Sequence, residues 1–422
     1  MDVIEWAFLV TVQFIDMKWI IVVSRYLPEN VGGNIVYVRM FAEELVKCGD
    51  SVHIVTTTRK KELPSLETGN GITIHRVYVA RGNMGPLWFK YSKRVTQYIK
   101  DLDAFEKFDC VNLHGPFTVN TRALRKGLFV LYTLHAVVSY EYVFRLKKIL
   151  IANKISVKSG TELLKAIILF PLHCIREWLC VRRANLVVVM SHYVKGTVKR
   201  YLPGVCLDRV IVSKIGVPSH FVPTSNKKQL KRELNLNHET CLLTVRRLED
   251  RMGLENLLAA IHLLSQDNLL GGVKLYIIGK GSLREKLERL IKGCNIEKYV
   301  ELLGFVEDTD LLRWYQACDV FVMPTEELEG FGISTIEAFA AGMPVVATSA
   351  GANPEVAGKL CPELITQSRN DPSELAEKIE YYLQKKVDYM SIDYSSMAKE
   401  EFNWEDIIKD IKSHLPDYLA AG

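Results

Sequence analysis

Short, continuous runs of hydrophobic residues alternate along this chain with longer stretches in which hydrophobic positions recur every three or four residues. The first run, Trp19–Ser24, has the composition of a strand that is buried on both faces. A helical pattern extends from Asn34 to Cys48, and Gly49 ends it. The alternation predicts an α/β fold with a mostly parallel sheet and helices on both faces. Further strands are predicted at Ser51–Thr56, Ile72–Val79, Cys110–His114, Val130–His135, Leu186–Met190 and Val210–Lys214.

A second series of the same kind begins near Thr240. The segment before it, residues 216–231, contains two prolines and a polar run, and it is interpreted as a linker. We therefore predict two Rossmann-like, doubly wound domains that face a central cleft, over residues 17–215 and 232–395. The strands of the second series are predicted at Cys241–Val245, Val273–Ile278, Val300–Leu303, Val320–Met323 and Val345–Thr348.

Composition agrees with two domains and excludes several classes of protein. A chain of 422 residues is too long for one ordinary core. Its net charge of +5 is too small to indicate nucleic acid binding. Nine cysteines occur singly without a CxxC pair, which favours a reducing cytoplasm over a disulfide framework or a zinc site. Residues 1–16 lack the pattern of a signal peptide, and they are interpreted either as an upstream extension or as part of the fold.

The stretch most suggestive of chemistry is residues 329–346, which read EGFGISTIEAFAAGMPVV. Gly330 and Gly332 allow the backbone to approach a ligand closely. A helix predicted to start near Ile333 would direct its free N–H groups and positive dipole end at an anion such as a diphosphate. Glu329 and Glu337 flank this helix start, and carboxylates there can accept hydrogen bonds from the paired hydroxyls of a sugar or a ribose.

This stretch resembles the E-x7-E signature of the family 4 glycosyltransferases, with Glu329 and Glu337 at the matching spacing. The resemblance implies a GT-B fold and a hexosyltransferase-type enzyme. Such an enzyme transfers a sugar, with retention, from a nucleotide-sugar donor, for which UDP- or GDP-sugars are expected. The acceptor would be a glycan or a lipid-linked hydroxyl, and neither a metal nor another cofactor is expected. Other segments that look like the family's motifs, in the family's order, are Val245–Leu254, Ile277–Leu283, Val300–Phe305 and Ala317–Pro324.

The resemblance also implies roles for single residues. The family's diphosphate-binding arginine matches Arg247, and a guanidinium fork suits two phosphate oxygens. The family's phosphate-binding lysine matches Met252, which is a departure because Met carries no charge. Arg251 or Arg246 could supply the second charge, or the site could depend on Arg247 and the helix dipole alone. We expect Arg251 to supply this second charge.

His135 follows a predicted strand and matches a histidine that family members carry near the donor sugar, so the expected catalytic set is Glu329, His135 and Arg247. His114 also ends a strand, but a structural role is favoured for it. A glycine-rich loop, Gly32, Gly33 and Asn34, resembles the family's loop that faces the acceptor and the donor phosphate. The other expected donor-binding residues are Arg251, Gly279, Gly281, Phe305, Gly330, Phe331, Gly332, Ile333 and Glu337.

Three further segments allow more than one interpretation. Asp308-Thr309-Asp310 is formally a DxD metal motif, but we expect it to cap a helix starting at Leu311. Tyr140–Arg183 is rich in basic residues. It is interpreted either as helices with solvated basic faces or as a surface that contacts an anionic membrane. In the family a C-terminal helix, expected here within residues 396–422, crosses back to the N-terminal domain; the alternative is packing on its own domain.

Three rival functions stay open at this point. A catalytically inert nucleotide-sugar-binding protein is conceivable because of Met252. A GT-B epimerase or phosphorylase is a rival within the enzymes, although no cofactor lysine for a phosphorylase is evident. A Rossmann dehydrogenase is disfavoured because no GxGxxG motif follows either first strand.

Overall fold

The structure, a computed structural model, describes residues 16–29, 32–79, 88–115, 119–151 and 157–416. The possible N-terminal extension predicted at residues 1–16 therefore lies almost wholly outside the described residues. The chain divides into two compact units. One comprises Met1–Tyr132, Arg183–Leu186 and Ile408–Gly422, and the other comprises Thr133–Arg182 and Val187–Ile407.

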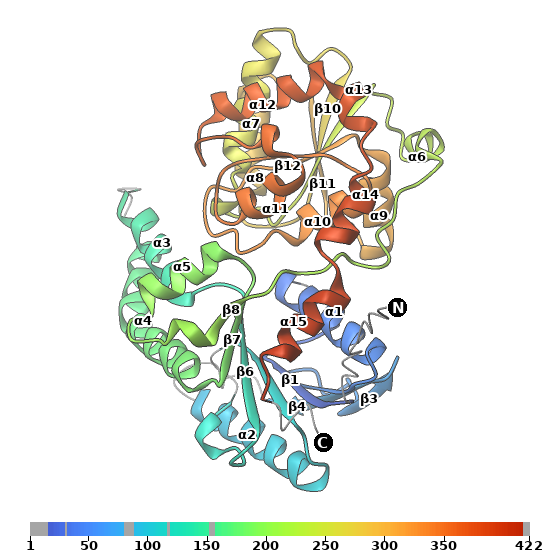
Figure 1. The fold of residues 1–422 in the computed structure, drawn as a ribbon. Coiled ribbons are helices and arrows are strands. Elements are labelled where there is room, and N and C mark those ends of the chain that lie inside the picture. The colour runs from blue at the N-terminus through green and yellow to red at the C-terminus, as the bar shows by residue number, and fades with distance from the viewer. Residues whose placement is uncertain (1–15, 30–31, 80–87, 116–118, 152–156, 417–422) are drawn as a thin grey trace, which may run out of the picture. The chain divides into compact units, whose positions relative to one another are not determined.

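Two sheets of mainly parallel strands form the framework of the chain (Figure 1). The first has eight strands in the order β3-β4-β2-β1-β5-β6-β7-β8, and only β3 is recorded as antiparallel to its neighbour. Its strands are β1 (Lys18–Val23), β2 (Ser51–Thr58), β3 (Leu66–Gly69), β4 (Ile72–Tyr78), β5 (Cys110–His114), β6 (Phe129–Leu134), β7 (Leu186–Val189) and β8 (Val210–Val212).

The second sheet has five parallel strands in the order β11-β10-β9-β12-β13. From the central strand β9 the chain first builds outward through β10 and β11, and it then returns to the other side of β9 for β12 and β13. This is the doubly wound order that the alternation of strands and helices predicted. The strands are β9 (Thr240–Val245), β10 (Val273–Ile278), β11 (Val300–Gly304), β12 (Val320–Met323) and β13 (Val345–Ala347).

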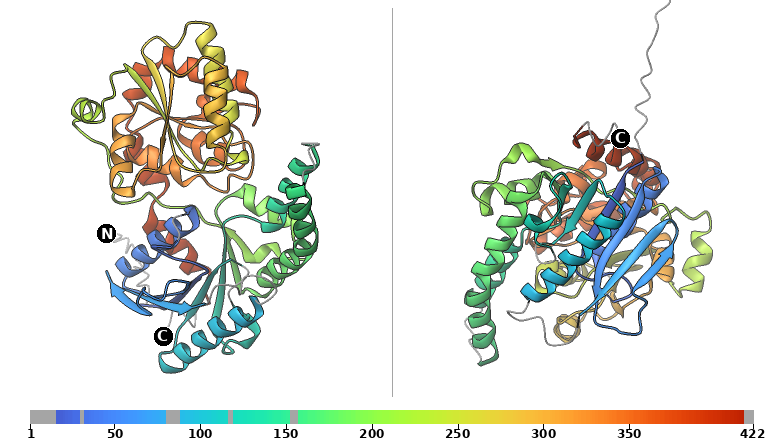
Figure 2. Two further views of the ribbon diagram at one scale, coloured as in Figure 1. Left: turned by 180° about the vertical axis from the view of Figure 1, so that it is seen from behind. Right: turned by 90° about the horizontal axis from the view of Figure 1, so that it is seen from below.

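Fifteen α-helices lie in the described part of the chain, and those of the second series enclose its sheet (Figures 1 and 2). Helices α7, α8 and α12 pack together, whereas α10 packs against α14. The helices are α1 (Gly33–Lys47), α2 (Trp88–Phe105), α3 (Val138–Ile151), α4 (Val157–Arg183), α5 (His192–Tyr201), α6 (Lys227–Glu233), α7 (Leu254–Gln266), α8 (Arg284–Gly293), α9 (Asp308–Ala317), α10 (Ile333–Ala340), α11 (Asn353–Leu360), α12 (Pro372–Gln384), α13 (Lys386–Met390), α14 (Tyr394–Glu401) and α15 (Trp404–Ser413).

The predicted strands are confirmed, and β5, β10 and β12 have the predicted bounds. Their side chains are almost all buried, which explains why they read as continuous apolar runs. The prediction missed β3, whose four residues are all exposed. The prediction that Asp308 and Asp310 precede a helix at Leu311 is wrong, because α9 already begins at Asp308 and both carboxylates lie in its first turn. They still suit the positive end of that helix dipole.

The last helix returns the chain to the first unit, as the resemblance implied. Residues from Ile408 onward belong to that unit, and Ile408 and Ile411 are buried. Lys412 is buried with them, and its Nζ lies 2.8 Å from Oδ1 of Asp50. Asp50 immediately precedes β2, so a charged pair between distant parts of the sequence fastens α15 to the first sheet.

Candidate functional site

The order of the second sheet indicates where a ligand would bind. In an open parallel sheet, ligands bind beyond the carboxyl ends of the strands, where the chain reverses its direction of growth. Here that point lies between β9 and β12, which are neighbours in the sheet but not in the sequence. Arg246 directly follows β9, and Pro324–Gly332 connects β12 to α10. These two loops therefore form the candidate site.

A buried ion pair joins the two loops. Nη2 of Arg246 lies 2.7 Å from Oε2 of Glu329. The same nitrogen lies 3.1 Å from the sulfur of Met252, and Nη1 contacts the sulfur of Met323. The Arg246 side chain is only 5% exposed. The charge closest to Glu329 thus comes from Arg246, a residue that the sequence analysis considered only as an alternative to Arg251.

The surroundings of Glu329 keep its carboxyl group ionised. Burial by itself raises the pKa of Glu329, but the charge and the hydrogen bond of Arg246 lower it, and the net pKa lies below its ordinary value. The hydroxyl of Thr325 also donates a hydrogen bond of 2.9 Å to the same oxygen. Glu329 is therefore a fixed carboxylate that can accept hydrogen bonds from a ligand.

The loop that carries Glu329 has an unusual backbone conformation. Leu328 has φ of 63°, in the left-handed region that non-glycine residues rarely adopt. Nη1 of Arg251 donates a hydrogen bond of 3.0 Å to the carbonyl oxygen of Leu328, and Glu326 N–H donates to the carbonyl oxygen of Arg251. Arg251, predicted to bind phosphate, thus supports the loop, and its phosphate contact stays a prediction.

Helix α10 begins at Ile333, as predicted, after Gly332 at φ 91°. No side chain caps its first turn, and no acidic residue lies there. Its N-terminus therefore offers the positive dipole end that suits an anion. Glu337, further along the helix, accepts a hydrogen bond of 2.9 Å from the hydroxyl of Tyr315. Phe331 packs its ring edge-to-face on Phe402, so its backbone is the part that a ligand could contact.

The turn after β10 packs directly on the loop after β9. A Cβ atom at Gly279, which has φ of 145°, would overlap the carbonyl oxygen of Arg246, and a Cβ atom at Gly281 would overlap that of Leu248. Both predicted glycines are thus explained by close backbone approach. Phe305, another predicted donor-binding residue, is exposed after β11, and Nζ of Lys280 lies 4.1 Å from its ring centroid.

His135 lies beside the same loop within the second unit. A Cβ atom at Gly330 would lie 2.6 Å from the carbonyl oxygen of His135, so only glycine fits there. The hydroxyl of Ser191 donates a hydrogen bond of 2.7 Å to the carbonyl oxygen of Gly330. Burial lowers the pKa of His135 to about 4, so its imidazole is neutral at pH 7. The structure thus brings His135 next to the Glu329 loop.

The adjacent arginines differ sharply. Arg247, predicted to be the main diphosphate ligand, has an exposed side chain, whereas Arg246 is buried. Met252, at the position of the expected lysine, is buried against Arg246. Sequence reasoning missed the central place of Arg246. Two features of the sequence could have indicated Arg246. It directly follows β9, and the family's lysine is replaced by Met252, which leaves a cation missing nearby.

The remaining predicted residues of the first unit lie outside this site. In the first unit, Gly32 is the N-cap of α1, and Gly33 and Asn34 lie in its first turn, so two of the three predicted loop residues belong to this helix. His114 is buried. Among the described residues, no group of three or more His, Cys, Asp or Glu side chains could hold a metal ion. Metal independence stays a prediction.

No described helix is both long enough and apolar enough to cross a membrane.

Two family models match most of the chain. "Glycosyltransferase Family 4" matches residues 31–218, and "Glycosyl transferases group 1" matches residues 226–401. An uncharacterised glycosyltransferase of Methanocaldococcus jannaschii is 27% identical over 402 residues, which cover 93% of this chain and 96% of the relative. A GDP-mannose-dependent phosphatidylinositol monomannoside mannosyltransferase of Mycobacterium tuberculosis is 30% identical over 135 residues, 31% of this chain and 34% of that protein.

Solved structures share the fold. Sucrose-phosphate synthase from Thermosynechococcus elongatus superposes with a TM-score of 0.74 at 20% identity, over 96% of this chain and all of the other. An Anabaena protein crystallised with UDP and glucose superposes with a TM-score of 0.65 at 18% identity, over 94% of this chain and 98% of that one. At these identities the likeness establishes the architecture of two Rossmann-like domains.

Proposed function

Because this chain belongs to the family 4 glycosyltransferases of the GT-B fold, we propose that it transfers a sugar, with retention of configuration, from a UDP- or GDP-sugar to a hydroxyl group. The observation that carries this proposal is the site between β9 and β12. An uncapped helix start, an ionised carboxylate and a buried guanidinium lie together there. A nucleotide sugar offers a matching diphosphate and a matching set of hydroxyls.

Each part of the donor has a counterpart in the site. The diphosphate binds at the N-terminus of α10, where the first-turn N–H groups and the dipole favour negative charge. Glu329 accepts hydrogen bonds from sugar hydroxyls. The neutral imidazole of His135 donates or accepts one more. Phe305 and Lys280 provide a flat, cationic surface for the base.

The reaction follows from holding the diphosphate as a leaving group. The bond between the anomeric carbon and the phosphate oxygen breaks, and a bond to the acceptor oxygen forms on the same face of the sugar. The acceptor's proton passes to the departing phosphate oxygen. Arg247 and the α10 N-terminus stabilise the negative charge that develops on that phosphate. The neutral His135 is suited to hydrogen bonding near the reacting carbon without adding a charge.

A panel of UDP-, GDP-, ADP- and TDP-sugars in a thermal-shift assay tests the donor, because a bound ligand raises the melting temperature. We expect a UDP- or a GDP-sugar to give the largest shift. The M. tuberculosis relative is named GDP-mannose-dependent, and the Anabaena protein was crystallised with UDP, which supports these two bases. Donor hydrolysis or transfer is then compared for the intact chain, Glu329→Ala and Arg247→Ala. Binding with turnover unchanged in both variants would show that the assigned site is wrong.

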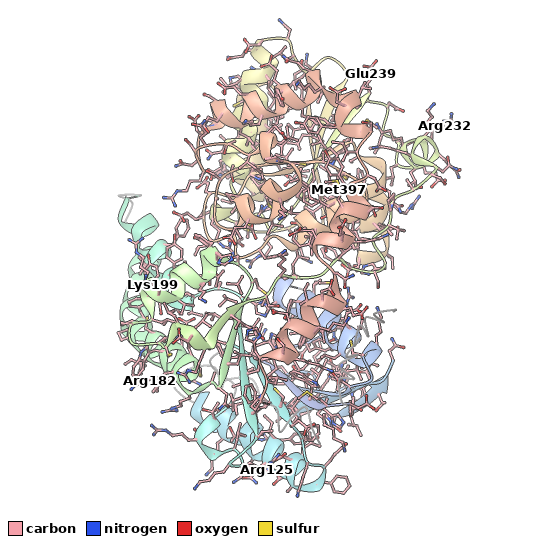
Figure 3. All side chains as sticks on the ribbon, in the orientation of Figure 1. Arg125, Arg182, Lys199, Arg232, Glu239 and Met397 are labelled. Carbon is pink, nitrogen blue, oxygen red and sulfur yellow. The ribbon has the colours of Figure 1, made fainter. Side chains whose placement is uncertain are left out.

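For the acceptor, we propose a lipid-linked hydroxyl at an anionic membrane on the cytoplasmic side. Leu172 and Ile175 are three residues apart on α4, so they share a face of the helix, and they are 47% and 54% exposed. Arg182 and Lys199 are also exposed, on α4 and α5 (Figure 3). Exposed apolar and basic side chains together suit the interface of an anionic bilayer.

The charge balance of this surface supports the same proposal. Glu177 does not contribute a surface charge, because it is fully buried and its carboxylate accepts from the N–H groups of Val138 and Ser139 at 2.7 and 3.1 Å. None of the nine cysteines, all in the described part of the chain, forms a disulfide bond, which supports a reducing compartment.

Flotation with phosphatidylglycerol vesicles at low salt tests the membrane surface. We expect the intact chain to float, and we expect the double variant Leu172→Glu/Ile175→Glu to stay behind. Val387→Glu, a change of another exposed apolar residue on α13, is the matched control and should float. Equal flotation of the double variant and the control would show that this face of α4 does not contact the membrane.

A further inference from the structure

The guanidinium of Arg246 is buried with fewer strong acceptors than it has donors. An arginine carries five N–H donors in a planar fork. Glu329 supplies one carboxylate oxygen at 2.7 Å, and the other neighbours recorded are the thioether sulfurs of Met252 and Met323. Thioethers are weak acceptors. The Nε–H group is buried and meets no hydrogen-bond acceptor among the residues that the structure describes.

A buried donor without an acceptor is unfavourable and rare in folded proteins. It is expected where a ligand completes the hydrogen bonding. The two methionines around Arg246 are unbranched and flexible, so they can move aside for a ligand without disturbing the backbone. The unsatisfied donor thus indicates a binding function for Arg246 beyond its ion pair.

The position of Arg246 indicates which ligand group would reach it. Its backbone N–H donates to the carbonyl oxygen of Ile278 at 2.9 Å, and the Gly279 turn packs on its carbonyl oxygen. Its side chain reaches Glu329, three residues before the N-cap of α10. Arg246 therefore connects the turn after β10 to the loop that opens the anion-binding helix.

Charge leads to the same conclusion. Glu329 is ionised and lies next to the helix start, so it would repel a diphosphate bound there. Arg246 is the cation that directly contacts Glu329, whereas Arg251 donates to a backbone carbonyl and Arg247 is exposed. A cation shared between the two anions would offset this repulsion.

We propose that Arg246 is a second diphosphate-binding side chain of this enzyme, alongside Arg247, and that it bridges the diphosphate to Glu329. Nη2 holds the carboxylate, while Nε–H donates to a phosphate oxygen of the donor. Arg246 thereby supplies the charge that is absent at Met252, and it fixes the carboxylate against the sugar. This inference rests on the proposed nucleotide-sugar function of the same site.

Binding of UDP and GDP, and of inorganic pyrophosphate alone, is measured by calorimetry for the intact chain and for Arg246→Met. Met keeps an unbranched apolar stem without the charge, and it suits its thioether neighbours. We expect binding of the nucleotide that the intact chain prefers to weaken about tenfold to hundredfold, the value of one charge-assisted hydrogen bond. Arg313→Met is the matched control, because Arg313 also pairs with a glutamate at 2.7 Å, but at an exposed position on α9. It should bind like the intact chain.

A charge-rescue variant separates the role in binding from a purely structural one. The sulfur of Met252 lies 3.1 Å from Nη2 of Arg246, so Arg246→Met/Met252→Lys places an ammonium group where the guanidinium was. We expect it to recover most of the lost affinity. If Arg246→Met does not fold, Arg246→Gln, which keeps an uncharged donor on a shorter side chain, takes its place and should bind as weakly.

The pH profile of kcat/KM gives a second readout. Arg246 lowers the pKa of Glu329, with smaller contributions from Thr325 and Arg251. Its removal should therefore move the acidic limb of the profile to higher pH. Equal nucleotide affinity and an unchanged acidic limb in the Arg246 variant would overturn this inference while the proposed function stands. Failure of the intact chain to bind any nucleoside diphosphate would overturn the proposed function, and the inference with it.

Discussion

Removing the buried positive charge of Lys412 should destabilise the first unit strongly. Lys412 is 3% exposed, its partner Asp50 is fully buried, and their charged atoms lie 2.8 Å apart. Asp50 also accepts hydrogen bonds from Met17 N–H at 2.9 Å and from Trp19 Nε1 at 3.1 Å. One carboxylate therefore ties α15, β1 and the start of β2 together.

The expected magnitude follows from what Lys412→Met leaves behind. A carboxylate that stays buried after the loss of its partner costs about 3–5 kcal/mol. Two hydrogen bonds remain, so we place the loss near the lower end, at about 3 kcal/mol. Burial already raises the pKa of Asp50, and the Lys412 contact only partly offsets this effect. The variant should raise that pKa further.

The sign of the pH dependence is a second part of this prediction. The pKa of Asp50 is higher in the folded protein than in the unfolded chain. The folded protein therefore binds a proton on Asp50 more tightly than the unfolded chain does, and stability falls as pH rises through the folded pKa. The loss in Lys412→Met should be larger at neutral pH than at acidic pH, because protonation of Asp50 removes the unpaired buried charge. Asp50→Asn/Lys412→Met, which removes both charges, should be more stable than Lys412→Met.

Hydrogen exchange at the amides of β1 and α15 measures the free energy of opening in this unit, and it does not require the whole chain to unfold in one step. Lys409→Met, an exposed lysine on the same helix, is the control and should change this free energy by less than about 0.5 kcal/mol. Equal opening free energies for Lys412→Met and Lys409→Met would refute the reasoning. A double variant no more stable than Lys412→Met alone would refute it as well.

Three further predictions concern the site and the first sheet. Glu329→Gln should lower kcat/KM about tenfold to hundredfold in a transfer assay, because the neutral amide loses its pairing with the buried guanidinium and binds sugar hydroxyls less well. Gly279→Ala should weaken binding of UDP or GDP and lower the melting temperature, because residue 279 has φ of 145° and the added Cβ would overlap a carbonyl oxygen. Gly271→Ala, at an open position, should change neither the binding nor the melting temperature. Burial, and next the charge of His53, lower the pKa of His75 to about 4. The first unit should therefore lose up to about 3 kcal/mol of stability between pH 6.5 and pH 4, and calorimetric melts of His75→Gln should show a flatter pH dependence.

A specific result would contradict each of these three predictions. Full activity of Glu329→Gln would mean that this carboxylate does not bind the sugar. Identical behaviour of the two glycine variants would mean that the turn after β10 tolerates a side chain. The same acid sensitivity in His75→Gln and the intact chain would assign that sensitivity to other groups.

Strands with a continuous buried run could be predicted from the sequence. β5, β10 and β12 have the predicted bounds because burial on both faces leaves no polar position to interrupt the pattern. β3 could not be predicted, because its four residues are exposed and only their pairing with β4 makes them a strand. The start of α10 was predictable from its glycines, since Gly332 has a positive φ that other residues avoid.

In the site, the sequence alone identified the Glu329 loop, the helix start at Ile333 and the neighbouring His135. Each of these depends on local features, namely glycine spacing, strand ends and a motif. The sequence assigned the diphosphate to Arg247 by resemblance, but it could not show which of the adjacent Arg246 and Arg247 is buried. The tertiary structure shows this, because β9 and β12 are neighbours only in the folded sheet. That arrangement places Glu329, Met252 and Met323 around one guanidinium and leaves the other exposed. Burial and pairing of a charge depend on residues distant in the sequence, and only the packed sheet brings those residues together.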